Sequence, residues 1–124
     1  MGEIIDFDGN GPIPGNLKGV NKRSNRYKDL VRFYQRLLSL LAEPSESLHK
    51  VERRLPMKAI VCEKVIFKVD KTRKMESEAF RGKPIEYGVY VQLCNSLTGD
   101  LNRLGWESEA EQETALHAIT GGHA

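Results

Sequence analysis

Two groups of lysine and arginine are the residues in this sequence whose type and spacing could do chemistry. The first places five cations within eleven residues, with no acid among them: Lys18, Lys22, Arg23, Arg26 and Lys28. The second group is Lys64, Lys68, Lys71, Arg73 and Lys74. Clustered cations bind phosphate groups and attract polyanions, of which nucleic acid is the commonest. The alternative interpretation is that these side chains only solvate the segments that carry them.

The charge of the chain is distributed unevenly. Its 124 residues carry a net charge of only +2. Residues 18–74, however, contain 16 Lys and Arg and 6 Asp and Glu, a net of +10, whereas residues 75–124 contain 3 and 8, a net of −5. The first 17 residues carry −3. The small total therefore hides a basic middle between two acidic ends, and a basic segment favours a polyanionic partner.

Residues typical of catalysis or metal binding form no recognisable pattern. The histidines are scattered, at positions 49, 117 and 123, and the sequence contains no CxxC, HExxH, GxSxG or GxxxxGK[ST] motif. Three acids that follow basic residues are expected to form surface ion pairs rather than an acid–base site. They are Asp70, Glu76 and Glu78. We therefore expect a protein that is not an enzyme and that needs neither a metal nor a cofactor.

The cysteines and the overall hydropathy point to the compartment. Cys62 and Cys94 lie inside apolar patterns, which favours two reduced core thiols over a disulfide. The sequence contains no run of about 18 apolar residues, so we predict no membrane span, and no secretory signal is recognisable. We expect one cytoplasmic domain, and a chain of this size often gains stability by forming oligomers.

The first half of the chain divides into an arm and a helix. Residues 1–24 are rich in Gly and Pro and poor in large apolar side chains, which predicts a flexible basic arm outside the core. Residues 25–43 carry an apolar stripe at helical spacing, and Ser24 or Asn25 can cap its start before Pro44 stops it. The stripe is Tyr27, Leu30, Val31, Tyr34, Leu37, Leu38 and Leu41.

A short turn after Ser45 or Ser47 leads to a second, longer helix. Pro56 fits its first position, where a missing N–H costs nothing. Residues 57–78 are helix-compatible, although KVIFKV, with its β-branched residues, could also form a strand. We favour the helix, because the segment contains neither Gly nor Pro. RGKP, residues 81–84, then predicts a turn.

The stretch GVYVQLCNSLTGDLNRLGW, residues 88–106, has two periodicities. Alternating apolar residues from Ile85 to Val91 fit a strand, whereas spacings of three and four through to Leu104 fit a helix. A lone strand would need partners that the sequence does not offer. We therefore predict an extended approach over residues 85–88 and a helix to Leu104, with Gly105 at its left-handed end. The acidic tail is compatible with further helix over residues 107–119.

These elements predict an all-α fold. It consists of a flexible arm (1–24), a helical core and oligomerisation domain (25–106) built on a helical hairpin with a further C-terminal helix, and an acidic tail (107–124). We expect two apolar stripes to pack together and their leftover surface to serve subunit contacts. Their residues are Tyr27, Leu30, Tyr34, Leu37, Leu41, Leu93, Leu97, Leu101 and Leu104.

The order of these elements resembles the small subunit of phage terminases, of the short helical type found beside head genes. The resemblance covers roughly residues 27–109 and rests on LPMKAIVCEKVIFKVDKTRKM, the Gly/Pro turn and VYVQLCNSLTGDLNRLG. The family continues past LG with Leu, Thr or Ser, and Pro, whereas Trp106, Glu107 and Ser108 stand here. No recognisable helix-turn-helix precedes the core.

The resemblance implies a non-enzymatic packaging factor in the cytoplasm of a bacterial host. Such a factor would assemble as a homo-oligomeric ring, bind double-stranded viral DNA and recruit the large terminase subunit. Two alternative functions would also be compatible with the basic middle of the chain and would not involve DNA packaging. One is a small helical phage or plasmid DNA-binding regulator, expected as a dimer on a palindromic site. The other is a structural head-assembly adaptor, expected to show little salt-dependent DNA binding.

Overall fold

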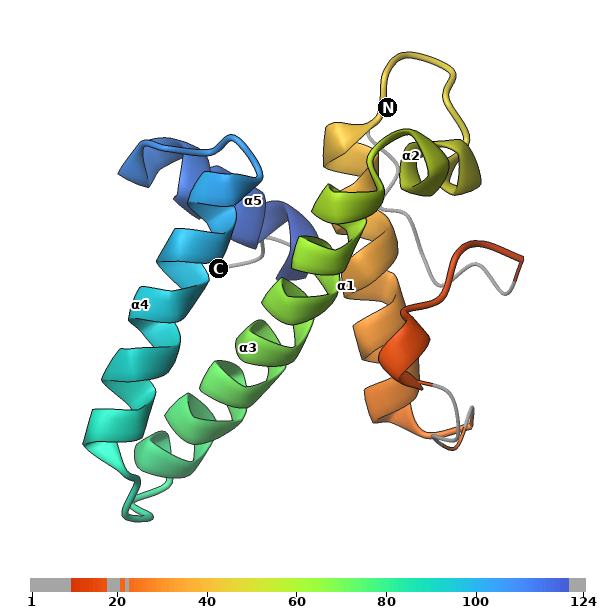
Figure 1. Cartoon of the computed structure of the whole chain (residues 1–124). Helices are drawn as coiled ribbons and strands as arrows, with labels where there is room; N and C mark the ends of the chain where they lie inside the picture. Colours follow the sequence, from red (N-terminus) through yellow and green to blue (C-terminus); the bar gives the residue numbers. More distant parts are fainter. Residues whose placement is uncertain (1–9, 18–20, 22, 121–124) are drawn as a thin grey trace.

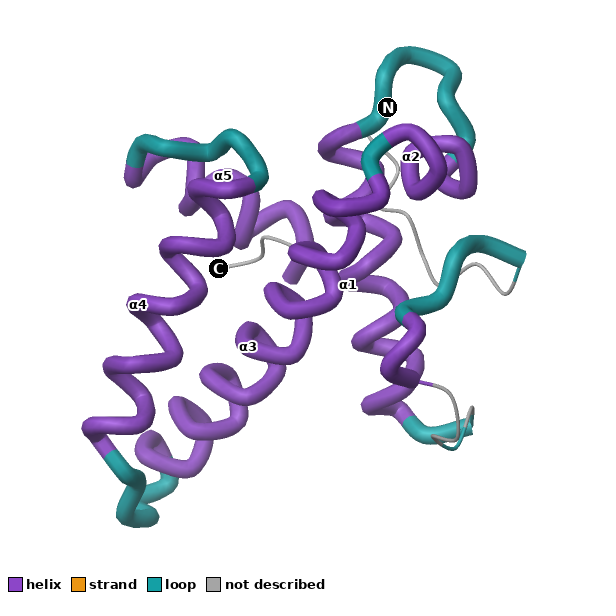
Figure 2. Tube along the Cα trace, in the orientation of Figure 1, coloured by secondary structure: helices purple, strands orange, loops and turns teal. Residues whose placement is uncertain are grey.

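The computed structural model describes residues 10–17, 21 and 23–120, without the side chain of Asn16. This part of the chain is helical and contains no strand (Figures 1 and 2). The elements are the short 3-10 helix Gly15–Leu17, α1 (Asn25–Leu41), α2 (Leu48–Arg54), α3 (Pro56–Phe80), α4 (Tyr87–Arg103) and α5 (Glu109–Thr120). The predicted all-α class is confirmed, and KVIFKV lies inside α3.

The longest helix, α3, lies between α1 and α4 (Figure 1). It runs in the opposite direction to α4 beside it, while α1 diverges from it toward the N-terminal end of α1. Helix α5 returns to pack against α1, which closes the core on that side. Because both neighbours press on α3, its buried residues occupy a wide face: Ala59, Cys62, Val65, Ile66, Val69, Thr72 and Met75.

Local sequence signals fix the starts of the first three helices. The Ser24 hydroxyl accepts a hydrogen bond from the Tyr27 N–H at 3.1 Å and so caps α1. The Ser47 hydroxyl caps α2 in the same way, by accepting from the Lys50 N–H at 3.3 Å. Pro56 occupies the start of α3, where its fixed φ suits the helix.

The ambiguous stretch at residues 85–104 is one helix, which begins at Tyr87 and ends in a left-handed glycine cap. Gly105 has a φ of 104°, and its N–H donates to the Asn102 carbonyl at 3.0 Å. The N–H of Trp106 reaches back to the carbonyl of Leu101 at 3.1 Å. This pair of bonds satisfies carbonyls that a helix end leaves open, and it turns half-buried Trp106 onto the core.

The acidic tail belongs to the core, so the predicted boundary at residue 106 is wrong. Ser108 and Glu111 form a reciprocal cap that starts α5: the Glu111 N–H donates to the Ser108 hydroxyl at 3.1 Å, and the Ser108 N–H donates to Glu111 at 3.2 Å. Ile119 is fully buried, and its carbonyl accepts a hydrogen bond from Arg36 at 3.1 Å. The two buried residues of α5, Ala115 and Ile119, are therefore sufficient to pack this helix against α1.

The prediction of a flexible arm is wrong for residues 10–17. Pro12, Pro14 and Leu17 are buried, and Gln35, itself buried in α1, donates to the Pro12 carbonyl at 3.4 Å. His49 bonds the Asn10 carbonyl at 2.8 Å. Three apolar side chains and two polar anchors thus hold the segment against α1 and α2. Residues 1–9, 18–20 and 22 lie outside the described part of the chain.

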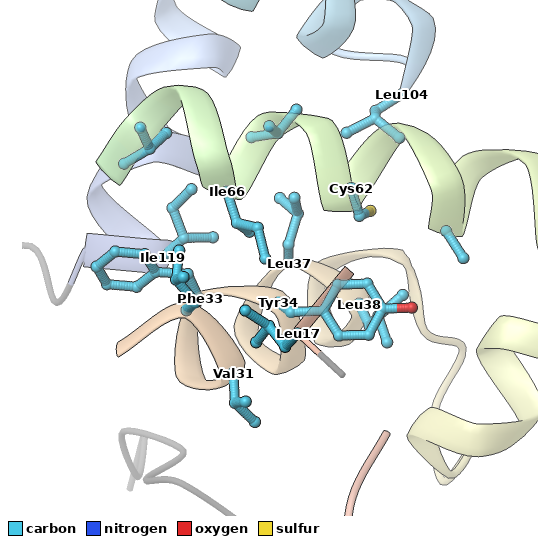
Figure 3. Packing of buried hydrophobic residues seen from close by; sticks show 14 of the residues in the cluster. Leu17, Val31, Phe33, Tyr34, Leu37, Leu38, Cys62, Ile66, Leu104 and Ile119 are labelled. Carbon is cyan, nitrogen blue, oxygen red and sulfur yellow. The ribbon is translucent and has the colours of Figure 1, made fainter. Parts of the chain in front are cut away.

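The two apolar stripes meet α3 rather than each other, which corrects their predicted packing. Figure 3 shows Leu37 of α1 pointing toward Ile66 and Cys62, while Leu104 lies on the opposite side of α3. Seven of the nine stripe residues assigned to subunit contacts are buried inside this chain, and only Leu41 and Leu93 are half-buried. Their side chains are therefore taken up by the chain's own core, and the assignment is wrong for those seven.

A buried carboxylate ties α3 to α4. The side chain of Asp100 is only 4% exposed, and it accepts a charge-assisted hydrogen bond from the Lys68 ammonium. Arg103 approaches its other oxygen at 3.5 Å, and Lys68 also donates to the Ser96 hydroxyl at 2.6 Å. Because an unpaired buried charge is costly, Lys68 has a structural role at this contact.

We expect Lys68→Met to lower the free energy of unfolding by about 2 to 3 kcal/mol, since it leaves Asp100 without its main partner. Arg103 remains, which keeps the loss below that of a fully isolated charge. The double variant Lys68→Met/Asp100→Leu should recover most of the loss. Urea unfolding followed by circular dichroism measures both changes.

Lys64→Met is the matched control, because Lys64 lies one turn earlier on α3 and is exposed. It should change stability by less than about 0.5 kcal/mol. Equal losses in Lys64→Met and Lys68→Met would contradict the structural role of Lys68.

Both cysteines are free thiols, as the sequence predicted. Cys62 is fully buried in the core, and burial raises the pKa of its thiol to about 12. Since only the thiolate reacts with disulfide reagents, the folded protein should protect Cys62 at pH 8.

In Cys94→Ser, the thiol of Cys62 should therefore react only as fast as the protein unfolds, and at once in denaturant. A spectroscopic thiol assay measures this. Labelling of the folded variant at the rate of an exposed thiol would show that this part of the core is open.

Among the described residues, no helix combines the length and the apolarity needed to cross a membrane.

Candidate nucleic-acid interface

A groove of about 860 Å³ is lined by residues of α1 and α3. Figure 1 shows that the start of α1 and the C-terminal half of α3, which carry most of these residues, diverge from each other. The groove lining contains four cations from two helices: Arg26, Lys71, Arg73 and Lys74. The first comes from one predicted basic group and the other three from the second. The fold thus joins parts of both groups on one concave surface, although about 45 residues separate them in sequence.

The α1 side of the groove is fixed by an ion pair with α3. Arg26 donates through Nε to Asp70 Oδ2 at 3.3 Å, and its side chain is 66% exposed. Arg26 lies in the first turn of α1, where no acidic side chain opposes the partial positive charge of the helix start. The guanidinium therefore sits where a phosphate is favoured, while one carboxylate orients it.

The α3 side presents three exposed cations, Lys71, Arg73 and Lys74. The Arg73 guanidinium lies 5.6 Å from the centroid of the Phe33 ring on α1, within the range of a cation–π interaction. This contact positions Arg73 across the groove and leaves its charge near the surface. Lys71 and Lys74 are three residues apart on the exposed side of the helix, so they are neighbours on one face.

Aromatic side chains line the groove between these cations. Phe33 is buried and Phe67 is half-buried, and Met75 adds a third apolar side chain. The cations can contact the phosphates of a nucleic-acid backbone, whereas the two rings are largely covered and serve to support the cations, as Phe33 does for Arg73. The same surface would not hold a small apolar ligand firmly, because it is wide and open along the protein surface.

Carboxylates also line the groove and must be counted with the cations. They are Asp29, Asp70 and Glu78. Two of them are already paired, since Asp29 accepts from Arg32 at 2.8 Å and Asp70 from Arg26. The net charge of the lining is therefore small. A bound polyanion would contact Lys71 and Lys74 directly and would compete with Asp70 for Arg26.

The structure divides the predicted DNA-binding residues into three sets. Lys18 and Lys22 lie outside the described residues. Arg23 and Lys28 are exposed near the start of α1 but do not line the groove, and Lys64 lines a shallower hollow of about 370 Å³ beside Leu93. The assignment of Lys68 to DNA binding is corrected, because its ammonium donates hydrogen bonds to Asp100 and Ser96 within this chain.

Sequence reasoning missed the parts of the groove that depend on long-range contacts. Phe33 is absent from the predicted stripe of residues 25–43, and nothing local indicates that Arg26 reaches Asp70. The expectation that Asp70 forms a surface ion pair is confirmed, with a partner that spacing could not identify. The signal that pointed to Arg26 was its place in a group of five cations within eleven residues.

Within the described part of the chain, no group of three or more His, Cys, Asp and Glu side chains could hold a metal ion.

Comparison with known proteins gave no match: no protein-family model, no curated protein and no solved structure is detectably similar to this chain.

Proposed function

We propose that this chain binds double-stranded DNA through the groove between α1 and α3, and that it serves as a DNA-packaging factor of the terminase small-subunit type. The observation that carries the DNA-binding proposal is the junction of Arg26 with Lys71, Arg73 and Lys74 around two aromatic rings. The packaging role rests on the resemblance to that family in the order of the elements.

The chemistry of the groove favours contacts to the DNA backbone. Lys71 and Lys74 would each neutralise a phosphate and release its counterions, which makes binding depend steeply on salt. Arg26 would exchange the Asp70 carboxylate for a phosphate oxygen, which its planar donors fit well. Contacts of this kind position a protein on a duplex and carry little sequence information by themselves.

The proposed packaging role is that of an adaptor and includes no catalytic step by this chain. It would assemble as a ring of identical subunits, hold viral DNA and bring it to the large terminase subunit, which performs cleavage and translocation. Several weak phosphate-binding grooves in one assembly would act together, because a second contact made by the same assembly is effectively intramolecular. The modest net charge of a single groove is then sufficient.

Lys71→Ala/Lys74→Ala should weaken binding to specific and scrambled duplexes alike. The slope of log affinity against log salt should become shallower by about 2, because each phosphate that a lysine no longer neutralises removes about 0.9 from the slope. Fluorescence anisotropy with a labelled duplex across a salt series measures this.

The matched control is Lys50→Ala/Arg53→Ala, which removes the same charge from exposed positions on α2, away from the groove. It should leave the slope nearly unchanged. If both double variants lose the same slope, binding depends on overall charge and the groove is not the site.

Asp70→Asn should strengthen DNA binding, since it removes the carboxylate that competes for Arg26 and deletes one negative charge from the groove. The expected gain is roughly fivefold, corresponding to about 1 kcal/mol for one unit charge close to a phosphate in water. Stability should change little, because an exposed ion pair contributes about 0 to 1 kcal/mol.

Glu43→Gln makes the same change in net charge at a position that is 71% exposed and lies neither in the groove nor on α5, so it should leave affinity almost unchanged. Weaker binding by Asp70→Asn, in a variant that unfolds like the parent, would contradict competition between Asp70 and a phosphate.

A further inference from the structure

The turn between α3 and α4 presents exposed aromatic side chains. Phe80, the last residue of α3, is 93% exposed, and Tyr87, the first residue of α4, is 71% exposed. Val91 lies one turn further along α4 and is 38% exposed. We call Phe80, Tyr87 and Val91 the apolar tip. Side chains so open to water contribute little to the core of this chain, and several exposed apolar residues around one turn indicate an interaction surface.

An apolar hollow lies at the opposite end of α4, between the end of α1 and the start of α5. It has a volume of about 330 Å³, and we call it the end hollow. Its lining is Leu40, Trp106, Ala110, Glu111, Thr114 and Ala115. Leu40 is 42% exposed there, so an apolar side chain entering the hollow would cover it. The space exceeds the volume of one aromatic side chain.

The charges around these two surfaces are complementary. Arg81 and Lys83 follow Phe80 directly, and both are exposed, whereas Glu86 is the one acid between Phe80 and Tyr87. The end hollow adjoins a run of exposed acids with no basic residue among them: Glu107, Glu109, Glu111 and Glu113. Glu76 and Glu78 also lie near the end of α3, so the charge match depends on the two cations that follow Phe80, Arg81 and Lys83, facing the acids beside the hollow.

The geometry of α4 prevents one chain from satisfying both surfaces. The helix has 17 residues, so it holds the tip about 25 Å from the hollow. Figure 1 shows the α3–α4 turn and the α4–α5 connection at opposite ends of this helix. The tip can reach a hollow only on another molecule, and the contact would join two different surfaces.

We propose that the apolar tip of one copy seats in the end hollow of a second copy, with Phe80 as the anchor. Arg81 and Lys83 would then approach the acids of the second copy's α5. Each copy keeps one unused tip or hollow, so association continues head to tail until the geometry closes it. The proposal rests on the self-assembly part of the proposed function and is independent of the groove.

The expected contact is weak between two isolated copies. A single aromatic anchor with a charged rim covers less area than the roughly 1,000 Å² that a stable interface needs. The exposed side of α4 next to the tip can add to it, because the sequence from Tyr87 to Gly99 contains no charged residue. We therefore expect association at micromolar concentrations that falls with salt.

Two single variants and their mixture test the proposal. Phe80→Ser disables the tip and keeps the hollow, while Ala110→Arg blocks the hollow with a bulky cation and keeps the tip. Both positions are exposed, so folding should persist, which circular dichroism can verify. Sedimentation velocity is measured over a range of micromolar concentrations for the full chain, each variant and their equimolar mixture. Met57→Ser, at an apolar position 72% exposed on α3, is the control.

The proposal predicts that the full chain and Met57→Ser form species larger than a dimer, and that each blocked variant alone stays monomeric. The mixture should form dimers and nothing larger, because only one productive tip and hollow then meet. Association of Phe80→Ser or Ala110→Arg like the parent, or a monomeric mixture, would overturn this interface while leaving self-assembly intact. A full chain that stays monomeric would overturn both this interface and the proposed assembly, whereas the DNA groove is tested separately by its salt dependence.

Discussion

The rest of the structure depends on the packing of α3 between two neighbours. Val65, Ile66 and Val69 are each no more than 3% exposed, which shows how closely α1 and α4 cover this helix. The burial of such side chains contributes about 1.5 to 3 kcal/mol each relative to exposure. The side of α3 that faces away from the buried residues stays open to solvent, and Lys64, Phe67, Lys71 and Lys74 lie on it. The core thus determines which cations can meet a partner.

Burial also separates the roles of side chains that look alike in sequence. Lys68 and Lys71 are three residues apart, yet one binds a buried carboxylate on α4 and the other lines the groove. The difference follows from the helical rotation between the two positions and from which neighbour each position meets. The number of cations in a basic sequence cluster is therefore an upper limit on the number that can contact a polyanion.

Local signals predicted most of the helices. Ser24, Ser47 and Pro56 begin helices as expected, and Gly105 ends one, because caps act through the backbone of their own turn. The arrangement of the helices was less predictable. Amphipathic periodicity shows that α1 has a buried face, but not that α3 covers it, since any apolar helix would satisfy the same pattern. The packing of α1 against α4 was wrongly predicted for this reason.

Amino-acid composition gave a wrong prediction where a few specific contacts hold a segment in place. Residues 10–17 are rich in Gly and Pro, yet Leu17 and two prolines are buried and Gln35 bonds the Pro12 carbonyl. The groove has the same character: its cations belong to the two predicted basic groups, but the Arg26–Asp70 ion pair and the contact of Arg73 with the Phe33 ring join distant parts of the chain. Contacts between residues far apart in the chain produce no regular spacing in the sequence, so they could not be predicted from it.

The most direct test of the central claim, that the groove between α1 and α3 receives DNA, is an NMR titration of the labelled protein with a short duplex. If DNA binds in the groove, the largest shifts should fall on Arg26, Phe67, Lys71 and Lys74, on two helices at once. The Lys68 and Asp100 signals should move little, because their ion pair lies between α3 and α4 and does not line the groove. Shifts confined to α2 or to the acidic α5, or saturable binding with no shift at the groove, would contradict this claim.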